Sequence, residues 1–188
     1  NRNNYKKLKN DISPLNLDNL QIYGDVTYEF YKENKKMIFE KNSFDGRVIF
    51  NDMEISGWDI SFIDKSETLN LNSDLKSFNG LTWCLNFIDS RLNNVNISVD
   101  KSKCEDALNL IRSKGTINNI YISNSISDGL DADFSKLKIK NLNSVNSENK
   151  VEKSEVNLNS ESIVKNKESE LNSKTINQIK NIAQEEKT

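Results

Sequence analysis

The sequence LNFIDS at residues 85–90 recurs as LNLIRS at residues 108–113 and as LDADFS at residues 130–135. A constant period of about 20 to 25 residues is typical of a solenoid, in which each repeat forms one coil. The repeat therefore predicts stacked coils, and the leucines that open the segments should form one row along the common axis. These leucines follow one another at intervals of 23 and 22 residues: Leu85, Leu108 and Leu130.

A second block follows each of these segments, as LNNV at residues 92–95, INNI at residues 117–120 and IKNL at residues 139–142. Asparagine tolerates left-handed backbone geometry, and stacked amide groups can hydrogen-bond along a solenoid axis. The block therefore predicts an asparagine ladder at a turn between two strands. The alternative is a set of chance matches in an asparagine-rich chain. The ladder would contain the third residue of each copy: Asn94, Asn119 and Asn141.

Alternation of apolar and polar residues indicates that each copy of the first block is a strand, because successive side chains of a strand point to opposite faces. In this interpretation the apolar residues face the core, and Asn86, Asn109 and Asp131 face outward. A leucine-rich repeat has a similar period, but it needs an LxxLxL frame and a helical segment in each repeat. Short strands separated by Asn, Ser and Gly favour a parallel β-helix.

The repeats divide the chain into five regions. Residues 1–19 are a polar leader, and residues 20–56 contain β-branched and aromatic runs that predict strands beside the solenoid. Residues 57–143 hold the coils, residues 144–172 are a polar linker, and residues 173–188 have the apolar spacing of an amphipathic helix that could cap the last coil. We therefore expect an all-β fold, a short right-handed parallel β-helix of about three to four coils.

Composition excludes several classes of protein. The formal net charge of -2 supplies no strong field for nucleic acid, and no apolar stretch reaches the roughly 20 residues of a membrane-spanning helix. The chain has no histidine, which removes the commonest general base and the usual catalytic zinc ligand. Its two cysteines, Cys84 and Cys104, lack the spacing of a zinc site, and we expect them to be free thiols.

Three segments carry a resemblance to a known family: NGLTWCL at residues 79–85, CEDALN at residues 104–109 and SDGLDADF at residues 127–134. They resemble bacterial right-handed parallel β-helix proteins of the pectate-lyase-like superfamily, in particular its extracytoplasmic members. The resemblance covers about residues 46–142 and implies an extracytoplasmic location. The superfamily contains polysaccharide lyases, hydrolases, adhesins and structural stacks, so the resemblance does not choose an activity.

Acidic residues of neighbouring coils form a candidate calcium site. A period of 22 residues places Asp106 beside Asp128, and Asn109 beside Asp131. Calcium accepts six to eight oxygen ligands with tolerant geometry, so stacked carboxylate and amide groups are suitable ligands. The alternative is that Asp106 and Asp128 cap turns through their own backbone.

Two sets of residues are candidates for catalysis. In a lyase of the pectate type, the resemblance implies an arginine or lysine base beside calcium, and Arg112 is the candidate, at the position that Asp89 and Phe134 occupy in neighbouring coils. Asp131 and Asp133 should share one face of a strand, roughly 6.6 Å apart at their Cα atoms. That separation is compatible with the carboxylate pair of an inverting glycosidase, but solvated surface residues would have the same spacing.

Tyr121 lies between two inward-facing isoleucines and should point to solvent, where its ring could stack on a sugar. With Asn109 and Asp131, it is a candidate ligand-binding residue. We expect a non-enzymatic, extracytoplasmic module, either structural or carbohydrate-binding, whose partner is a polysaccharide or another cell-surface protein. The alternatives are a calcium-dependent polysaccharide lyase or glycoside hydrolase, and a truncated fragment without independent function.

Overall fold

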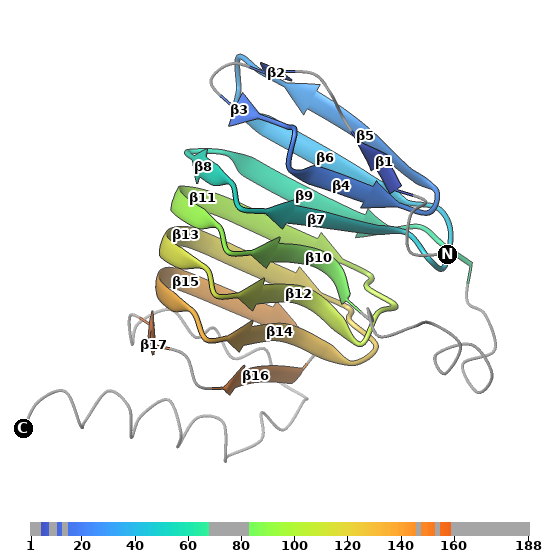
Figure 1. Cartoon of the computed structure of the whole chain (residues 1–188). Coiled ribbons are helices and arrows are strands. Elements are labelled where there is room, and N and C mark those ends of the chain that lie inside the picture. The colour runs from blue at the N-terminus through green and yellow to red at the C-terminus, as the bar shows by residue number, and fades with distance from the viewer. Residues whose placement is uncertain are drawn as a thin grey trace, which may run out of the picture.

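The computed structural model describes residues 5–7, 11–12, 15–67, 83–145, 148–152 and 155–158, and this part of the chain contains strands and no helix (Figure 1). The strands in chain order are β1 (Tyr5–Lys7), β2 (Asp11–Ile12), β3 (Leu15–Asn16), β4 (Leu20–Tyr23), β5 (Val26–Tyr31), β6 (Lys36–Lys41), β7 (Arg47–Asn51), β8 (Glu54–Ser56), β9 (Asp59–Asp64), β10 (Trp83–Ile88), β11 (Arg91–Asp100), β12 (Asp106–Ile111), β13 (Lys114–Ser123), β14 (Asp128–Asp133), β15 (Lys136–Val145), β16 (Glu148–Glu152) and β17 (Glu155–Leu158).

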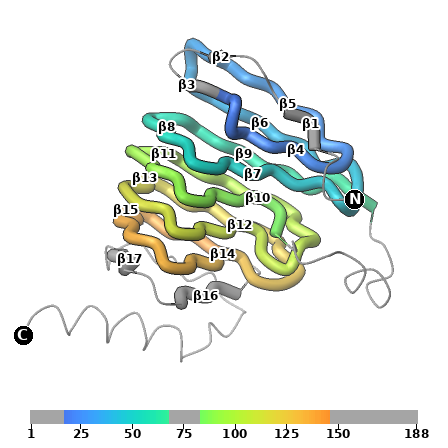
Figure 2. Tube along the Cα trace, viewed as in Figure 1, coloured from blue at the N-terminus to red at the C-terminus, as the bar shows by residue number. Residues whose placement is uncertain are grey.

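These strands form two long sheets and the separate pair β2–β3. The short-strand sheet has the order β1-β4-β7-β10-β12-β14-β16, and the long-strand sheet has the order β17-β15-β13-β11-β9-β6-β5. Each coil crosses from one sheet to the other, and the coils lie on one another (Figure 2). Neighbouring coils pair in parallel through both sheets. The result is the expected all-β parallel solenoid, with about four turns.

The leucine row lies inside this solenoid. Leu85 is paired with Leu108, and Leu108 with Leu130. All three side chains are fully buried. In the preceding coil Phe50 stacks on Phe87, with ring centroids 4.7 Å apart. Burial of each such side chain contributes roughly 1.5–3 kcal/mol, so the aligned apolar rows are the main source of stability.

The three coils that contain the first repeat turn the same corner through a residue with left-handed backbone geometry followed by a buried serine. The backbone N–H of Ser113 donates to the Oγ of Ser135 at 2.9 Å, and the N–H of Ser90 donates to the Oγ of Ser113 at 3.3 Å. This hydroxyl ladder satisfies buried backbone groups from coil to coil, which explains the serine that ends every copy of the first repeat. The left-handed residues are Asp89 (φ 52), Arg112 (φ 47) and Phe134 (φ 53).

Parallel stacking begins before the expected boundary at residue 57. β6 already pairs in parallel with β9, and β7 with β10. An antiparallel flank precedes them, in which β5 forms a hairpin with β6, and β4 pairs with β7. Tyr28 and Phe30 of β5 pack against the core. The flank therefore covers the first end of the solenoid, and part of the expected leader, β1, pairs with β4.

Strand pairing also enters the stretch expected to be a polar linker, residues 144–172. β15 extends to Val145, β16 pairs in parallel with β14, and β17 pairs in parallel with β15. Backbone hydrogen bonds of the preceding coil can order a polar segment without a large apolar core of its own. The amphipathic helix expected over residues 173–188 lies outside the described residues.

Candidate functional site

A ladder of three asparagine amide groups, which ends on the carboxylate of Asp59, crosses the outer face of the long-strand sheet. The Nδ2 of Asn96 donates to the Oδ1 of Asp59 at 2.6 Å, and the Nδ2 of Asn119 donates to the Oδ1 of Asn96 at 2.6 Å. The Nδ2 of Asn141 donates to the Oδ1 of Asn119 at 2.8 Å. Strand alternation directs these side chains outward, because their neighbours in β11 and β13 fill the core. We call these four residues the amide ladder.

The first member of the ladder differs from the expected one. Asn96, rather than Asn94, is paired with Asn119. The register between β11 and β13 shifts on both sides of Val95, and Asn94 has left-handed geometry, with φ 54. The pairing of β11 with β13 keeps an offset of 23 residues on both sides of this irregularity. The match of Asn94 to Asn119 in the second block, at an interval of 25, was therefore two residues out of register.

Tyr121 lies beside the amide ladder, two residues beyond Asn119 in β13. It is exposed, with 45 % of its surface accessible. In the neighbouring coils Ser98 and Asn143 are its register partners, and Ser98 donates to the hydroxyl of Ser61 at 2.9 Å. The outer face of the long-strand sheet thus combines an exposed aromatic ring with aligned amide and hydroxyl groups. We call Tyr121, its register partners and the amide ladder the polar face.

Asn109 and Asp131, the other candidate ligand-binding residues, lie in the other sheet. Asn109 pairs with Asn86 and Asp131 in the short-strand sheet, so the structure does not bring these residues to Tyr121. Asn86 and Asn109 were also expected to face outward, yet each is 1 % exposed. The Nδ2 of Asn86 donates to the carbonyl of Val48 in the preceding coil at 3.3 Å, which holds this amide against the sheet.

The proposed calcium ligands lie next to one another as the repeat predicts. Asp106 is paired with Asp128, and Asn109 with Asp131. Asp106 and Asp128 are buried. Within the parts of the chain that the structure describes, no group of three or more His, Cys, Asp or Glu side chains is arranged to hold a metal ion.

Arg112 is engaged in an ion pair at the coil corner. Its Nε and one terminal nitrogen donate to the two carboxylate oxygens of Asp89, both at 2.7 Å. Hydrogen bonding to Asp89 raises the pKa of Arg112, and hydrogen bonding to Arg112 lowers the pKa of Asp89. Because a base must be able to lose its proton, this arrangement does not favour Arg112 as the base of a lyase. Asp131 and Asp133, the candidate carboxylate pair, are both half-buried in β14.

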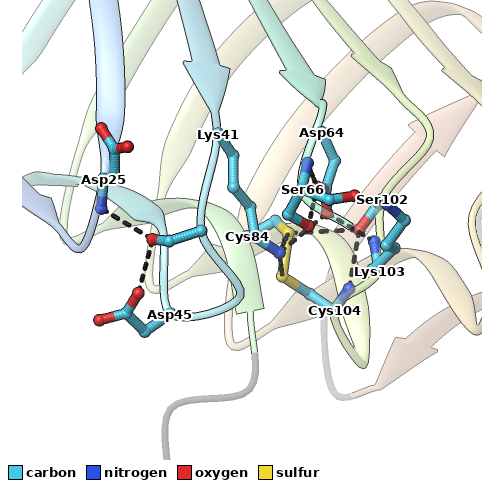
Figure 3. A network of polar contacts seen from close by, with 10 residues as sticks. Asp25, Lys41, Asp45, Asp64, Ser66, Cys84, Ser102, Lys103 and Cys104 are labelled. Carbon is cyan, nitrogen blue, oxygen red and sulfur yellow. Dashed lines mark hydrogen bonds and ion pairs between the residues drawn. A yellow bond between two sulfur atoms is a disulfide. The ribbon is translucent and has the colours of Figure 1, made fainter. Parts of the chain in front are cut away.

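A cluster of polar side chains is buried at the ends of the long strands β6 and β9 (Figure 3). The sequence had not led us to expect it. Lys41 ends β6, Asp64 ends β9, and the two residues are register partners. Lys41 Nζ lies 2.8 Å from Asp64 Oδ2, and both side chains are completely inaccessible to solvent. We call these residues and their polar neighbours the corner cluster; the other members are Ser66, Cys84, Ser102, Lys103 and Cys104.

Both oxygens of the Asp64 carboxylate accept hydrogen bonds. Oδ1 accepts from the backbone N–H of Ser66 at 3.0 Å and from its hydroxyl at 2.5 Å. Oδ2 accepts from Lys41 and from the backbone N–H of Lys103 at 2.9 Å. Burial lowers the pKa of Lys41, and the hydrogen bond to Asp64 opposes that shift. The carboxylate therefore has a fixed orientation toward the amine.

Cys84 and Cys104 form a disulfide bond, so the expectation of free thiols was wrong. Their Cα atoms are 5.5 Å apart because the coil returns the loop before β12 to the start of β10. The Nζ of Lys41 lies 3.6 Å from the sulfur of Cys84 and 3.5 Å from that of Cys104. The disulfide was not predicted from the sequence because 20 residues separate the two cysteines and no short motif links them.

A sequence signal for the buried ion pair does exist. Met37 and Phe39 of β6 face the core, and Lys41 follows in the same alternation. Ile60 and Phe62 of β9 face the core, and Asp64 follows them in the same way. Opposite charges at the inward positions of two strands would have predicted a buried pair, provided that the pairing of β6 with β9 was known.

Reduction of the disulfide should destabilise the fold. We expect the free energy of unfolding in urea to fall by about 2–4 kcal/mol, because the bond restricts the unfolded chain. The measurement compares oxidised and fully reduced protein, and the Cys84→Ser, Cys104→Ser double variant is the control on which reductant should have no effect. Equal stability of oxidised and reduced wild-type protein would contradict a structural role for the bond.

Comparison of the chain with protein-family models, with curated proteins and with solved structures finds no match. No helix among the described residues is long and apolar enough to cross a membrane.

Proposed function

We propose that this chain is an extracytoplasmic, carbohydrate-binding β-solenoid module related to the pectate-lyase-like superfamily. The observation that carries the proposal is the polar face, where Tyr121 stands exposed beside the amide ladder. An aromatic ring offers an apolar surface to the face of a sugar. Amide groups both donate and accept hydrogen bonds, as sugar hydroxyls require.

The extracytoplasmic location rests on the disulfide as well as on the sequence resemblance. Disulfides persist in oxidising compartments and are rare where cellular reductants keep thiols reduced. The disulfide joins Cys84, at the start of β10, to Cys104, in the loop before β12, inside the corner cluster. Cys84 is fully buried there. A disulfide in this position supports a protein that folds outside the reducing cytoplasm.

The proposal is tested by measuring glycan binding by variants of the polar face and of the short-strand sheet. We expect Tyr121→Ala to weaken binding on a glycan array roughly tenfold, because one aromatic contact contributes about 1 kcal/mol or slightly more. Tyr31→Ala is the matched control, since Tyr31 is equally exposed, at 46 %, but its hydroxyl is bound to Glu29 on the edge strand β5. Asp131→Ala tests the other sheet and should also leave binding unchanged.

Two outcomes of this experiment would count against the proposal. If wild-type protein binds no glycan, carbohydrate binding is removed and a purely structural role remains. If Asp131→Ala weakens binding while Tyr121→Ala does not, the ligand lies on the short-strand sheet and the polar face is the wrong site.

The second candidate function is a calcium-dependent polysaccharide lyase or glycoside hydrolase. The register of Asp106 with Asp128 and of Asn109 with Asp131 is the observation in its favour, because it brings oxygen-bearing side chains of neighbouring coils together in two pairs. The pairing of Arg112 with Asp89 speaks against Arg112 as the base. Calcium-dependent release of unsaturated or reducing sugar ends from polysaccharides would establish the enzyme and remove the non-enzymatic proposal.

A further inference from the structure

The corner cluster contains an amine and a carboxyl group that are buried together in a fixed geometry. Lys41 Nζ and Asp64 Oδ2 are 2.8 Å apart, and neither side chain is accessible to solvent. The reacting carbon, Cγ, is one bond beyond Oδ2. Groups held this close and this rigidly react as if at very high concentration. We propose that Lys41 and Asp64 become joined by an intramolecular amide bond between Nζ and Cγ.

The burial of the pair favours the unprotonated amine that this reaction needs. A charged amine and a charged carboxylate are both poorly solvated in a buried site. Burial lowers the pKa of Lys41, which favours loss of its proton. Of the three acceptors that the described residues place around Nζ, two are the disulfide sulfurs, which accept hydrogen bonds only weakly. Transfer of one proton from Nζ to Oδ2 gives a free amine next to a carboxylic acid.

The carboxyl group is also surrounded by donors in the places where the reaction develops charge. Attack of Nζ on Cγ places negative charge on Oδ1, which accepts hydrogen bonds from the N–H and the hydroxyl of Ser66. Such donors stabilise the tetrahedral intermediate as an oxyanion hole does. Oδ2, held by the N–H of Lys103, receives a second proton from Nζ and leaves as water.

The step balances without any other reactant. An ammonium group and a carboxylate are converted into one secondary amide and one molecule of water, and no atom is oxidised or reduced. The amide keeps one N–H, and its carbonyl oxygen, Oδ1, retains the two hydrogen bonds from Ser66. The product replaces two buried charges by one neutral, hydrogen-bonded group, which is the more favourable state in a site without water.

The mass of the full-length protein tests this proposal. After complete reduction and denaturation, we expect an intact mass lower than the sequence mass by one water. After digestion with trypsin, the segments that contain Lys41 and Asp64 should remain in one fragment, although cleavage at Arg47 lies between them. A wild-type mass equal to the sequence mass would overturn the proposal, as would loss of water in a digest whose two segments separate.

Two variants assign the reaction to its atoms. Lys41→Arg keeps a cation but has no comparable nucleophile, so its mass should equal its sequence mass. Asp64→Asn should lose one ammonia in place of water, because the same attack would then expel the amide nitrogen. Water loss that persists in Lys41→Arg would place the reaction elsewhere, for example at Asp45-Gly46 or Asp128-Gly129, and would overturn the proposal.

Discussion

Replacement of Gly115 by alanine should destabilise the fold strongly. Gly115 has φ +122, and a Cβ atom there would lie 2.0 Å from the carbonyl oxygen of Leu92 in the preceding coil. Two further backbone atoms of Leu92 would lie at 3.0 and 3.2 Å. Because the contacts are with backbone, the coils themselves must separate. We expect the free energy of unfolding to fall by about 3–5 kcal/mol, from overpacking and backbone strain together.

A second glycine separates these two causes. Gly57 also has a left-handed conformation, with φ +69, but a Cβ atom there would meet only the side chain of Lys35, at 3.7 Å or more. Gly57→Ala should therefore cost about 1–2 kcal/mol, from strain alone. Thermal unfolding followed by circular dichroism measures both variants, and Gly115→Ala should lower Tm by roughly 10 °C. A similar decrease in Tm for the two variants would show that the backbone at Leu92 moves away from residue 115 at little energetic cost.

The coil stack could be predicted from the sequence because two signals agree. The first repeat has both a regular interval and alternating apolar residues, and each requires the row that Leu85, Leu108 and Leu130 form. The N-terminal strands Leu20–Tyr23 and Val26–Tyr31 lie in the region, residues 20–56, where strands were predicted. Aromatic and β-branched residues favour strands, and the glycine between these two marks the turn.

Other parts of the structure depend on register, which a single sequence shows poorly. The amide ladder uses Asn96 because β11 pairs with β13 at an offset of 23 residues, whereas the repeated letters of LNNV and INNI suggested an offset of 25. The serines of the hydroxyl ladder recur in every copy of the first repeat, but they hydrogen-bond to one another only once the coils are stacked. In both cases a residue is identified by its position along a strand, and its hydrogen-bond partners depend on which strand pairs with that strand and in which register.

The corner cluster shows the same limit for charged residues. Lys41 and Asp64 are separated by 23 residues, and each residue type is usually exposed. Only the pairing of β6 with β9 brings them together, and only the return of the coil brings Cys84 and Cys104 to the same place. Long-range pairing of this kind decides which polar residues are buried, so the cluster could not be predicted before the fold.

Loss of the Asp64 carboxylate should destabilise the protein strongly. In Asp64→Ala, Lys41 remains buried at the end of β6, and among the described residues the acceptors left near its Nζ are the two disulfide sulfurs. Removal of one partner of a buried ion pair costs about 3–5 kcal/mol, because the remaining charge has neither water nor a counterion. A covalent bond between Lys41 and Asp64 would add to this loss. Urea unfolding of oxidised protein gives the measurement.

The neighbouring ion pair provides a matched control. Glu40 and Lys65 adjoin Lys41 and Asp64 in the same two segments, with 2.6 Å between Nζ and Oε1, but their side chains are 34 % and 51 % exposed. Water can replace either partner, so Glu40→Ala should cost only about 0–1 kcal/mol. If Asp64→Ala proved as mild as Glu40→Ala, Lys41 would have to reach solvent in the native protein. The corner cluster would then be an open site, and neither a buried ion pair nor a condensation that expels water could be maintained there.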